Sequence, residues 1–307
     1  MRLGSLHRRW SCLLVYAILS TSAVGNAYAG AWTLPRGHVW GKVTFMRQVT
    51  SEEYTAVGGG GRGGDPTRVY GPGDRASYRF NGRYSSYGVF LDLSYGLTGW
   101  LDVGAQVPYF DQNFSDSQDA FFLEDRGQRT LSDVRGTVKV RLTARPIVFS
   151  VGGAAKAPTG KFRNRDGLIT VADGQWDFDL LAQAGRSFWP VPAYANVDIG
   201  YRVRLKNRAV DRDPGDEWTF TAEAGVHVHP KVMTMLKVEG IRGRSGRSLG
   251  VQIPSDIRRI TYLSPAVMVG PFAGLSAEAG VRISLNGRNY PAGKMFVAGL
   301  SYAGKIF

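Results

Sequence analysis

The sequence has almost no cysteine, little histidine and no long apolar run after its first thirty residues. One cysteine, Cys12, in 307 residues excludes a disulfide-held fold and a cysteine-built zinc site. No later stretch of 18 or more apolar residues occurs, which excludes helical membrane spans. Charged residues are only 21% of the chain, so despite its net charge of +13 it is not a disordered polycation. The chain that remains is rich in glycine, with 40 residues, and 12% aromatic.

The N-terminus has the pattern of a secretory signal peptide. A basic region at 2–9 precedes an apolar stretch at 10–24, and an A-x-A cleavage pattern ends at Ala29. We expect residues 1–29 to be removed and residues 30–307 to form one domain outside the cytoplasm. That destination argues against nucleic acid as a partner of this basic chain and favours anionic lipopolysaccharide.

The rest of the chain alternates between apolar and polar residues with period two. In 193–206, Val197, Ile199 and Tyr201 share one face, while the intervening positions are mostly polar. Soluble sandwich strands average about five or six residues, whereas these runs match the 9–11 residues of a tilted bilayer crossing. Twelve such segments occur, at 39–49, 84–95, 101–110, 133–143, 147–157, 175–187, 193–205, 217–228, 232–242, 257–269, 273–285 and 294–306.

The connections between these segments alternate in length. Those at 50–83, 111–132, 158–174, 206–216, 243–256 and 286–293 are long. Those at 96–100, 144–146, 188–192, 229–231 and 270–272 have three to five residues. Such alternation predicts an all-β, transmembrane antiparallel β-barrel of twelve strands, with short periplasmic turns, long extracellular loops and both termini periplasmic. In a closed barrel every backbone N–H and C=O group within the lipid has a hydrogen-bond partner. We therefore expect the protein to lie in the bacterial outer membrane.

Aromatic residues gather at both ends of the expected strands, as the two girdles of an outer-membrane barrel do. The predicted girdle residues are Tyr95, Trp100, Tyr109, Trp176, Trp189, Trp218 and Tyr302. The chain stops at Phe307, as such barrels commonly do. We therefore expect the barrel assembly machinery to recognise the C-terminal strand.

If the apolar faces contact lipid, charges of both signs line the lumen. The predicted charge ladder comprises Arg135, Lys139, Arg141, Asp177, Asp179, Arg202, Arg204, Glu223, Lys237, Glu278 and Arg282. Folding the chain about Pro190 places Asp177 opposite Arg204 and Asp179 opposite Arg202. Folding it about Pro230 likewise places Glu223 opposite Lys237. Opposed charges fix the strand register, and a charged ring can also select solutes; the sequence leaves both roles open.

No motif predicts catalysis, a metal site or a cofactor. His227 and His229 lie beside a short turn, at the periplasmic end, away from the outer rim where barrel-embedded hydrolases have their serine and histidine. The glycine-rich run at 57–64 lacks the GK[ST] ending of a phosphate loop. A basic cluster around Lys161 and Arg163 could contact lipopolysaccharide phosphates. The sequence therefore predicts a protein that is not an enzyme.

Several stretches resemble an outer-membrane barrel family, the transporters of the meta-pathway of phenol degradation. They are YGLTGWLDVGAQVPYF (95–110), SDVRGTVKVRL (132–142), KAPTGKF (156–162), DGQWDFDLLAQAGRSF (173–188) and DIGYRVR (198–204), which match in order and spacing. The resemblance implies uptake of small, often aromatic or hydrophobic, compounds. We expect passive passage of small solutes; the alternative is a structural or surface-interaction barrel whose loops bind lipopolysaccharide or another surface.

Overall fold

A computed structural model of the chain describes residues 30–60, 67–117, 126–162 and 170–305. The predicted signal peptide, Arg163 and Phe307 lie outside these residues. In the part of the chain that is described, no helix is both long and apolar enough to cross a membrane.

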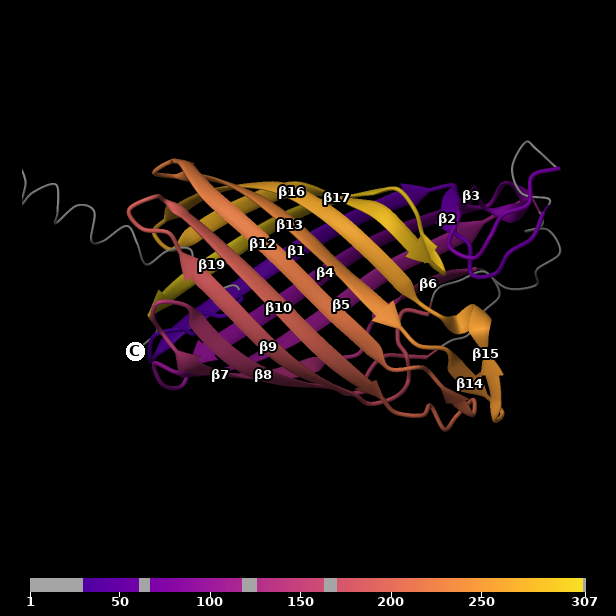
Figure 1. Ribbon diagram of the computed structural model, residues 1–307, viewed down its shortest axis with the longest axis horizontal. Helices are drawn as coiled ribbons and strands as arrows, with labels where there is room; N and C mark the ends of the chain where they lie inside the picture. Colours follow the sequence, from indigo (N-terminus) through magenta and orange to yellow (C-terminus); the bar gives the residue numbers. More distant parts are fainter. Residues whose placement is uncertain (1–29, 61–66, 118–125, 163–169, 306–307) are drawn as a thin grey trace, which may run out of the picture.

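Twelve antiparallel strands form a closed barrel (Figure 1), which confirms the predicted fold. Around the ring the order is β4-β1-β19-β17-β16-β13-β12-β10-β9-β8-β7-β5, and β5 pairs with β4 to close it. The strands are β1 (His38–Thr50), β4 (Arg83–Gly96), β5 (Leu101–Ser115), β7 (Arg135–Thr143), β8 (Val148–Lys156), β9 (Asp177–Ser187), β10 (Ala193–Arg204), β12 (Glu217–His229), β13 (Val232–Gly243), β16 (Arg259–Phe272), β17 (Leu275–Arg288) and β19 (Lys294–Lys305).

Smaller elements lie at the end of the barrel that carries the long connections (Figure 1). They are β2 (Glu52–Tyr54), β3 (Arg75–Ser77), β6 (Gly127–Leu131), β11 (Arg212–Asp213), β14 (Gly246–Ser248), β15 (Val251–Ile253), β18 (Tyr290–Pro291), and the 3-10 helices η1 (Arg79–Asn81) and η3 (Pro254–Asp256). A small apolar cluster of Tyr54, Ile260, Tyr262 and Ala292 packs the loop sheet of β2, β3 and β18 against the barrel at this end.

The alternation along each strand sorts side chains between lipid and lumen. On β9, Phe178 and Leu180 are 45% and 69% exposed, whereas Asp177 and Asp179 are 1% and 8% exposed. A slip of one residue would turn these carboxylates outward and the apolar side chains inward. Arg or Lys facing lipid near the midplane costs about 2–4 kcal/mol, so the charges that face the lumen strongly favour one register.

The observed register agrees with the predicted one. Asp177 pairs with Arg204 and Asp179 with Arg202 across β9 and β10. Glu223 pairs with Lys237 across β12 and β13.

Two connections differ from the prediction. Residues 111–132 were expected to form a loop, but β5 continues to Ser115 and pairs with β6. The sheet extends beyond the bilayer, where both faces of a strand contact water and an outward apolar residue is not required. The turn expected at 270–272 instead lies at Ala273 and Gly274, whose φ angles of 50° and 87° suit a tight hairpin turn.

Candidate functional site

The lumen contains a connected network of buried ion pairs on one side, from β7 to β12. Its cations are Arg135, Lys156, Arg202, Arg204 and Arg258, and its carboxylates are Asp133, Asp173, Asp177, Asp179 and Glu217. Five charges of each sign make this part of the wall neutral in sum. It is nevertheless highly polar, so a purely apolar solute gains little by contacting it.

Glu217 lies at the centre of this network, and its side chain is 1% exposed. Its Oε1 accepts hydrogen bonds from Arg258 Nη2 at 2.6 Å and from Arg204 Nη1 at 3.3 Å. Its Oε2 accepts one from Arg202 Nη1 at 3.1 Å. One carboxylate thus holds three guanidinium groups, two from β10 and one from the loop before β16.

Asp133 and Asp173 connect the network to the extracellular loops. Lys156 Nζ lies 3.1 Å from an oxygen of Asp133 and 2.6 Å from one of Asp173. Asp133 also accepts the backbone N–H groups of Gly160 and Asp173. Burial alone would raise the pKa of the Asp173 carboxyl, but Arg204 and its neighbouring cations hold that pKa well below its usual range.

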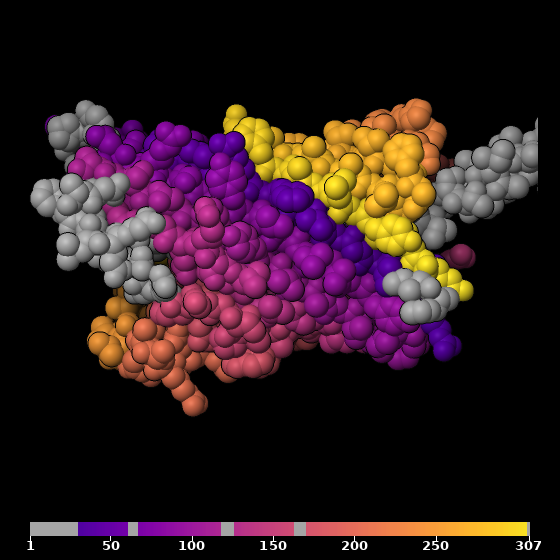
Figure 2. All heavy atoms as spheres, turned by 180° about the vertical axis from the view of Figure 1, so that it is seen from behind, coloured from indigo at the N-terminus to yellow at the C-terminus, as the bar shows by residue number. Residues whose placement is uncertain are grey.

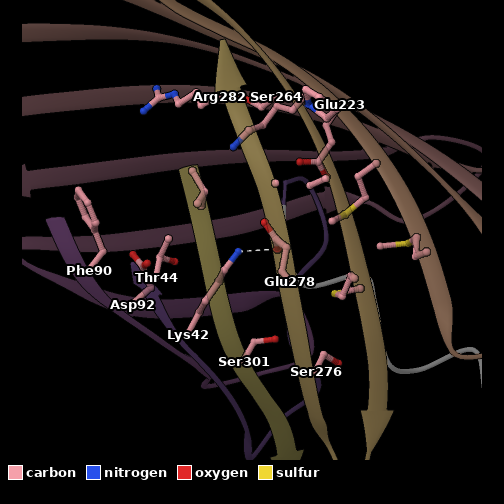
Figure 3. Close-up of a pocket in the computed structure, with 18 of the residues that line it drawn as sticks. Lys42, Thr44, Phe90, Asp92, Glu223, Ser264, Ser276, Glu278, Arg282 and Ser301 are labelled. Atoms are coloured by element: carbon pink, nitrogen blue, oxygen red, sulfur yellow. Dashed lines mark hydrogen bonds and ion pairs between the residues drawn. The ribbon is translucent and has the colours of Figure 1, made fainter. Parts of the chain in front are cut away.

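The other side of the lumen, from β12 to β4, surrounds a cavity of about 480 Å³. Its polar lining includes Lys42, Asp92, Glu223, Lys237, Glu239, Glu278 and Arg282 (Figure 3). Four of the six methionines, Met46, Met233, Met235 and Met268, also line it. Thioethers are flexible and polarisable and make favourable contacts with aromatic rings, so this wall can adapt to differently shaped apolar groups.

Ion pairs hold the charged side chains of this cavity against its wall. Lys42 Nζ on β1 lies 2.7 Å from Glu278 Oε2 on β17, although β19 separates these strands (Figure 3). The lysine crosses β19 at Gly299, where an added Cβ would come within 2.8 Å of Lys42 Cε. Arg282 Nε lies 2.8 Å from Glu239 Oε1. Each cation therefore lies flat on the sheet, and the centre of the cavity stays open.

The segment before β1 crosses the lumen at the end with the short turns. Ala31 and Leu34 are 0% and 2% exposed. Lys139 Nζ donates to the carbonyl oxygens of Gly30 and Trp32, at 3.0 and 2.6 Å. Leu34 N donates to both carboxylate oxygens of Asp102 at 3.0 Å. Residues 30–37, which we call the N-terminal strap, are therefore bound by side chains of the inner wall and narrow the lumen there.

The indole of Trp32 fixes the strap against two strands. It packs edge-on against Tyr194, with ring centroids 6.0 Å apart. It also covers Gly185 on β9, where an added Cβ would come within 2.7 Å of the ring. A side chain at residue 185 would thus compete with the strap for the same space.

The predicted ladder residues divide among these three features. Arg135, Asp177, Asp179, Arg202 and Arg204 join the buried network, and Glu223, Lys237, Glu278 and Arg282 face the cavity. Lys139 holds the strap, and Arg141 pairs in register with Ser150, whose side chain bonds the strap at Ala31.

Five members of the network were missing from the predicted ladder: Asp133 and Lys156, which lie in the predicted strand segments 133–143 and 147–157, and Glu217, Asp173 and Arg258. Glu217 has the same parity as Glu223 on β12, so the sequence did contain a signal for it. Asp173 lies in a connection without periodicity. Arg258 was placed inside the predicted strand segment 257–269 but precedes β16, which begins at Arg259. Only the fold brings both side chains to the wall.

Six of the seven predicted girdle residues lie near the strand ends, but Tyr109 lies inside β5, because that strand continues to Ser115. Among them, Trp100 is 53%, Trp176 46%, Trp189 68%, Trp218 48% and Tyr302 42% exposed, while Tyr95 and Tyr109 are partly buried. Trp176 stacks on Phe178 at 6.1 Å. Contact of the aromatic residues with the membrane interface stays a prediction.

A β-bulge separates His227 from His229 at the end of β12.

Known families and structures agree with this architecture. A family model described as "Putative MetA-pathway of phenol degradation" matches residues 81–299. An outer-membrane channel from Pseudomonas putida F1 has 17% sequence identity and a TM-score of 0.70, covering 90% of this chain and 98% of its own. The translocator domain of the autotransporter NalP from Neisseria meningitidis has 11% identity and a TM-score of 0.48, covering 95% and 97%. No curated protein matches the sequence.

Proposed function

The chain belongs to the family of the MetA-pathway of phenol degradation, and from this premise we propose that it is an outer-membrane channel for passive uptake of small solutes. The observation that carries the proposal is the open cavity of about 480 Å³ inside a closed twelve-stranded barrel. Barrels of eight strands are filled by side chains, and those of sixteen leave an aqueous channel. A barrel of twelve strands has room for a narrow path.

The lining of the path favours solutes with a small apolar or aromatic body and a polar group. Thioethers of Met233 and Met235 provide apolar contacts. The ion pairs beside them present hydrogen-bonding atoms without a large net charge. The solved channel from Pseudomonas putida F1 shares this fold, which supports the same class of role.

The N-terminal strap lies in the lumen at the end with the short turns, so we expect its displacement to raise the conductance. Gly185→Val places a side chain where Trp32 lies and should loosen the strap. Gly136→Val is the matched control on β7, because an added Cβ there meets no atom within 4 Å.

The test is single-channel recording of the refolded, signal-free protein in a planar bilayer. Wild type should give small, stable steps, and Gly185→Val larger ones, while Gly136→Val should behave as wild type. Folding is checked by the heat-dependent shift in gel mobility. If all three folded proteins stay silent, and aromatic solutes do not enter liposomes that contain them, the channel proposal is wrong.

The finer partner predictions belong to the same proposal. We expect the outward face to contact lipopolysaccharide, and the assembly machinery to recognise the C-terminal strand. The solved structure that shares this fold is a channel, and we propose that this protein likewise performs no catalysis.

A further inference from the structure

The outward face of β1, β4 and β19 carries a groove near the extracellular end. Its volume is about 670 Å³, and its lining includes Arg47, Val49, Arg83, Lys294 and Phe296. These strands are neighbours in the barrel, and Figure 2 shows their outer surface, with indigo β1 between yellow β19 and purple β4. The groove therefore faces the membrane, away from the lumen and the channel.

The strand register places the cations of the groove directly beyond an apolar band. Phe45 pairs with Val89 and with Ala298, which gives an apolar row across the three strands. The next outward row contains Arg47, which pairs with Tyr87 and Phe296. Two residues of a strand advance about 7 Å. The positive charge of Arg47 therefore lies two residues beyond an apolar surface that can contact acyl chains.

The groove has an excess of positive charge. Arg75 at its edge is paired with Glu52, with Nη2 and Oε2 2.5 Å apart, so these two charges cancel. In the described part of the chain, no carboxylate lies within ion-pair distance of Arg47, Arg83 or Lys294. Arg47 instead lies over the ring of Tyr87, 5.2 Å from its centroid. Three cations are therefore available to an anionic partner.

The excess of positive charge lies on one side of the barrel. Farther along the ring, beyond β17, Arg242 on β13 pairs in register with Arg259 on β16, and Arg259 is exposed. On the opposite side, the corresponding strand ends present Trp176, Phe178 and Trp218, which are 45–48% exposed. An asymmetric basic surface of this kind suits a discrete anionic ligand better than the uniform interface of a lipid bilayer.

We propose that this groove binds the phosphorylated glycolipid head of lipopolysaccharide, with the lipid A phosphates on Arg47, Arg83 and Lys294. Acyl chains then lie along Phe296 and the apolar row below it. Guanidinium groups match phosphate geometry, and the lysine adds a point charge. The proposal does not depend on solute passage, and it assigns lipopolysaccharide to the barrel wall rather than to the loop around Lys161.

The test measures binding of purified lipid A to the folded, signal-free protein in detergent, by native mass spectrometry with titration. The variant is Arg47→Gln/Arg83→Gln/Lys294→Gln. Each cation near an anionic lipid surface contributes about fivefold to binding, so the triple variant should bind roughly 100-fold more weakly. Removing the phosphates from lipid A should weaken binding to wild type by a similar factor.

The matched control is Arg186→Gln. Arg186 is also exposed and lies over an aromatic ring, 5.6 Å from the centroid of Phe188, but at the end with the short turns. It should bind lipid A as wild type does. The idea fails if the triple variant retains wild-type affinity, if dephosphorylated lipid A binds equally well, or if phosphatidylglycerol binds as tightly as lipid A.

A conductance measurement keeps this result separate from the channel proposal. The three cations face outward, so the triple variant should conduct as wild type does. Loss of lipid A binding with unchanged conductance supports the groove alone. A silent wild-type channel that still binds lipid A would refute solute passage and leave the groove intact.

Discussion

Replacing Glu217 by glutamine should destabilise the barrel more than any other single isosteric change in the network. The carboxylate is 1% exposed and accepts hydrogen bonds from Arg202, Arg204 and Arg258 at 2.6–3.3 Å. Glutamine retains the shape and one oxygen acceptor but removes the charge. Three guanidinium groups then share the remaining carboxylates, and Arg258 loses the one carboxylate among the described residues that lies within ion-pair distance of it.

The expected loss is about 3–5 kcal/mol in the free energy of unfolding, the usual cost of removing one partner from a buried ion pair. The control is Glu52→Gln, whose side chain is 40% exposed and pairs with Arg75, itself 49% exposed. Such surface pairs contribute about 0–1 kcal/mol. The two variants thus make the same chemical change at sites that differ in burial.

The assay is urea unfolding of the protein in lipid vesicles, followed by tryptophan fluorescence and gel mobility. Adding Arg258→Gln to Glu217→Gln should recover part of the loss, because the unpaired guanidinium is then gone. If Glu217→Gln costs no more than Glu52→Gln, the network does not stabilise the wall and the reasoning is refuted.

Other consequences can be measured in the same systems. The depressed pKa of Asp173 stabilises the fold above the unfolded value near pH 4, and this stability is lost as the pH falls below it; Asp173→Asn should flatten the dependence of the unfolding free energy on pH below about pH 5. Lys139→Met removes two hydrogen bonds to the strap and should raise the single-channel conductance, whereas an unchanged conductance would mean that the strap does not restrict the path. Arg202→Gln should shift ion selectivity toward cations, measured by the reversal potential in a salt gradient. Met235→Glu should slow liposome uptake of an aromatic solute, and Met235→Leu should not.

The sequence by itself determined the barrel, its strand number and much of its register. Period-two alternation can be recognised in the sequence without knowing any tertiary contact. In a bilayer, only a closed barrel satisfies the backbone hydrogen bonds of such strands. Short turns also reveal which strands are neighbours. For this reason the pairing of Asp179 with Arg202 could be predicted by counting from Pro190.

Only the tertiary structure decided what the inward charges contact and what fills the lumen. Asp173 comes from a connection, where no periodicity indicates the direction of a side chain, and Arg258 lies just before β16, although the predicted strand segment began at residue 257. The strap is held because Asp102 on β5, Lys139 on β7 and Asn196 on β10, which are distant in sequence, all form hydrogen bonds to its backbone. Closure of the sheet brings together strands that are distant in sequence and that no local pattern relates. The contacts inside the lumen therefore depend on all twelve strands together.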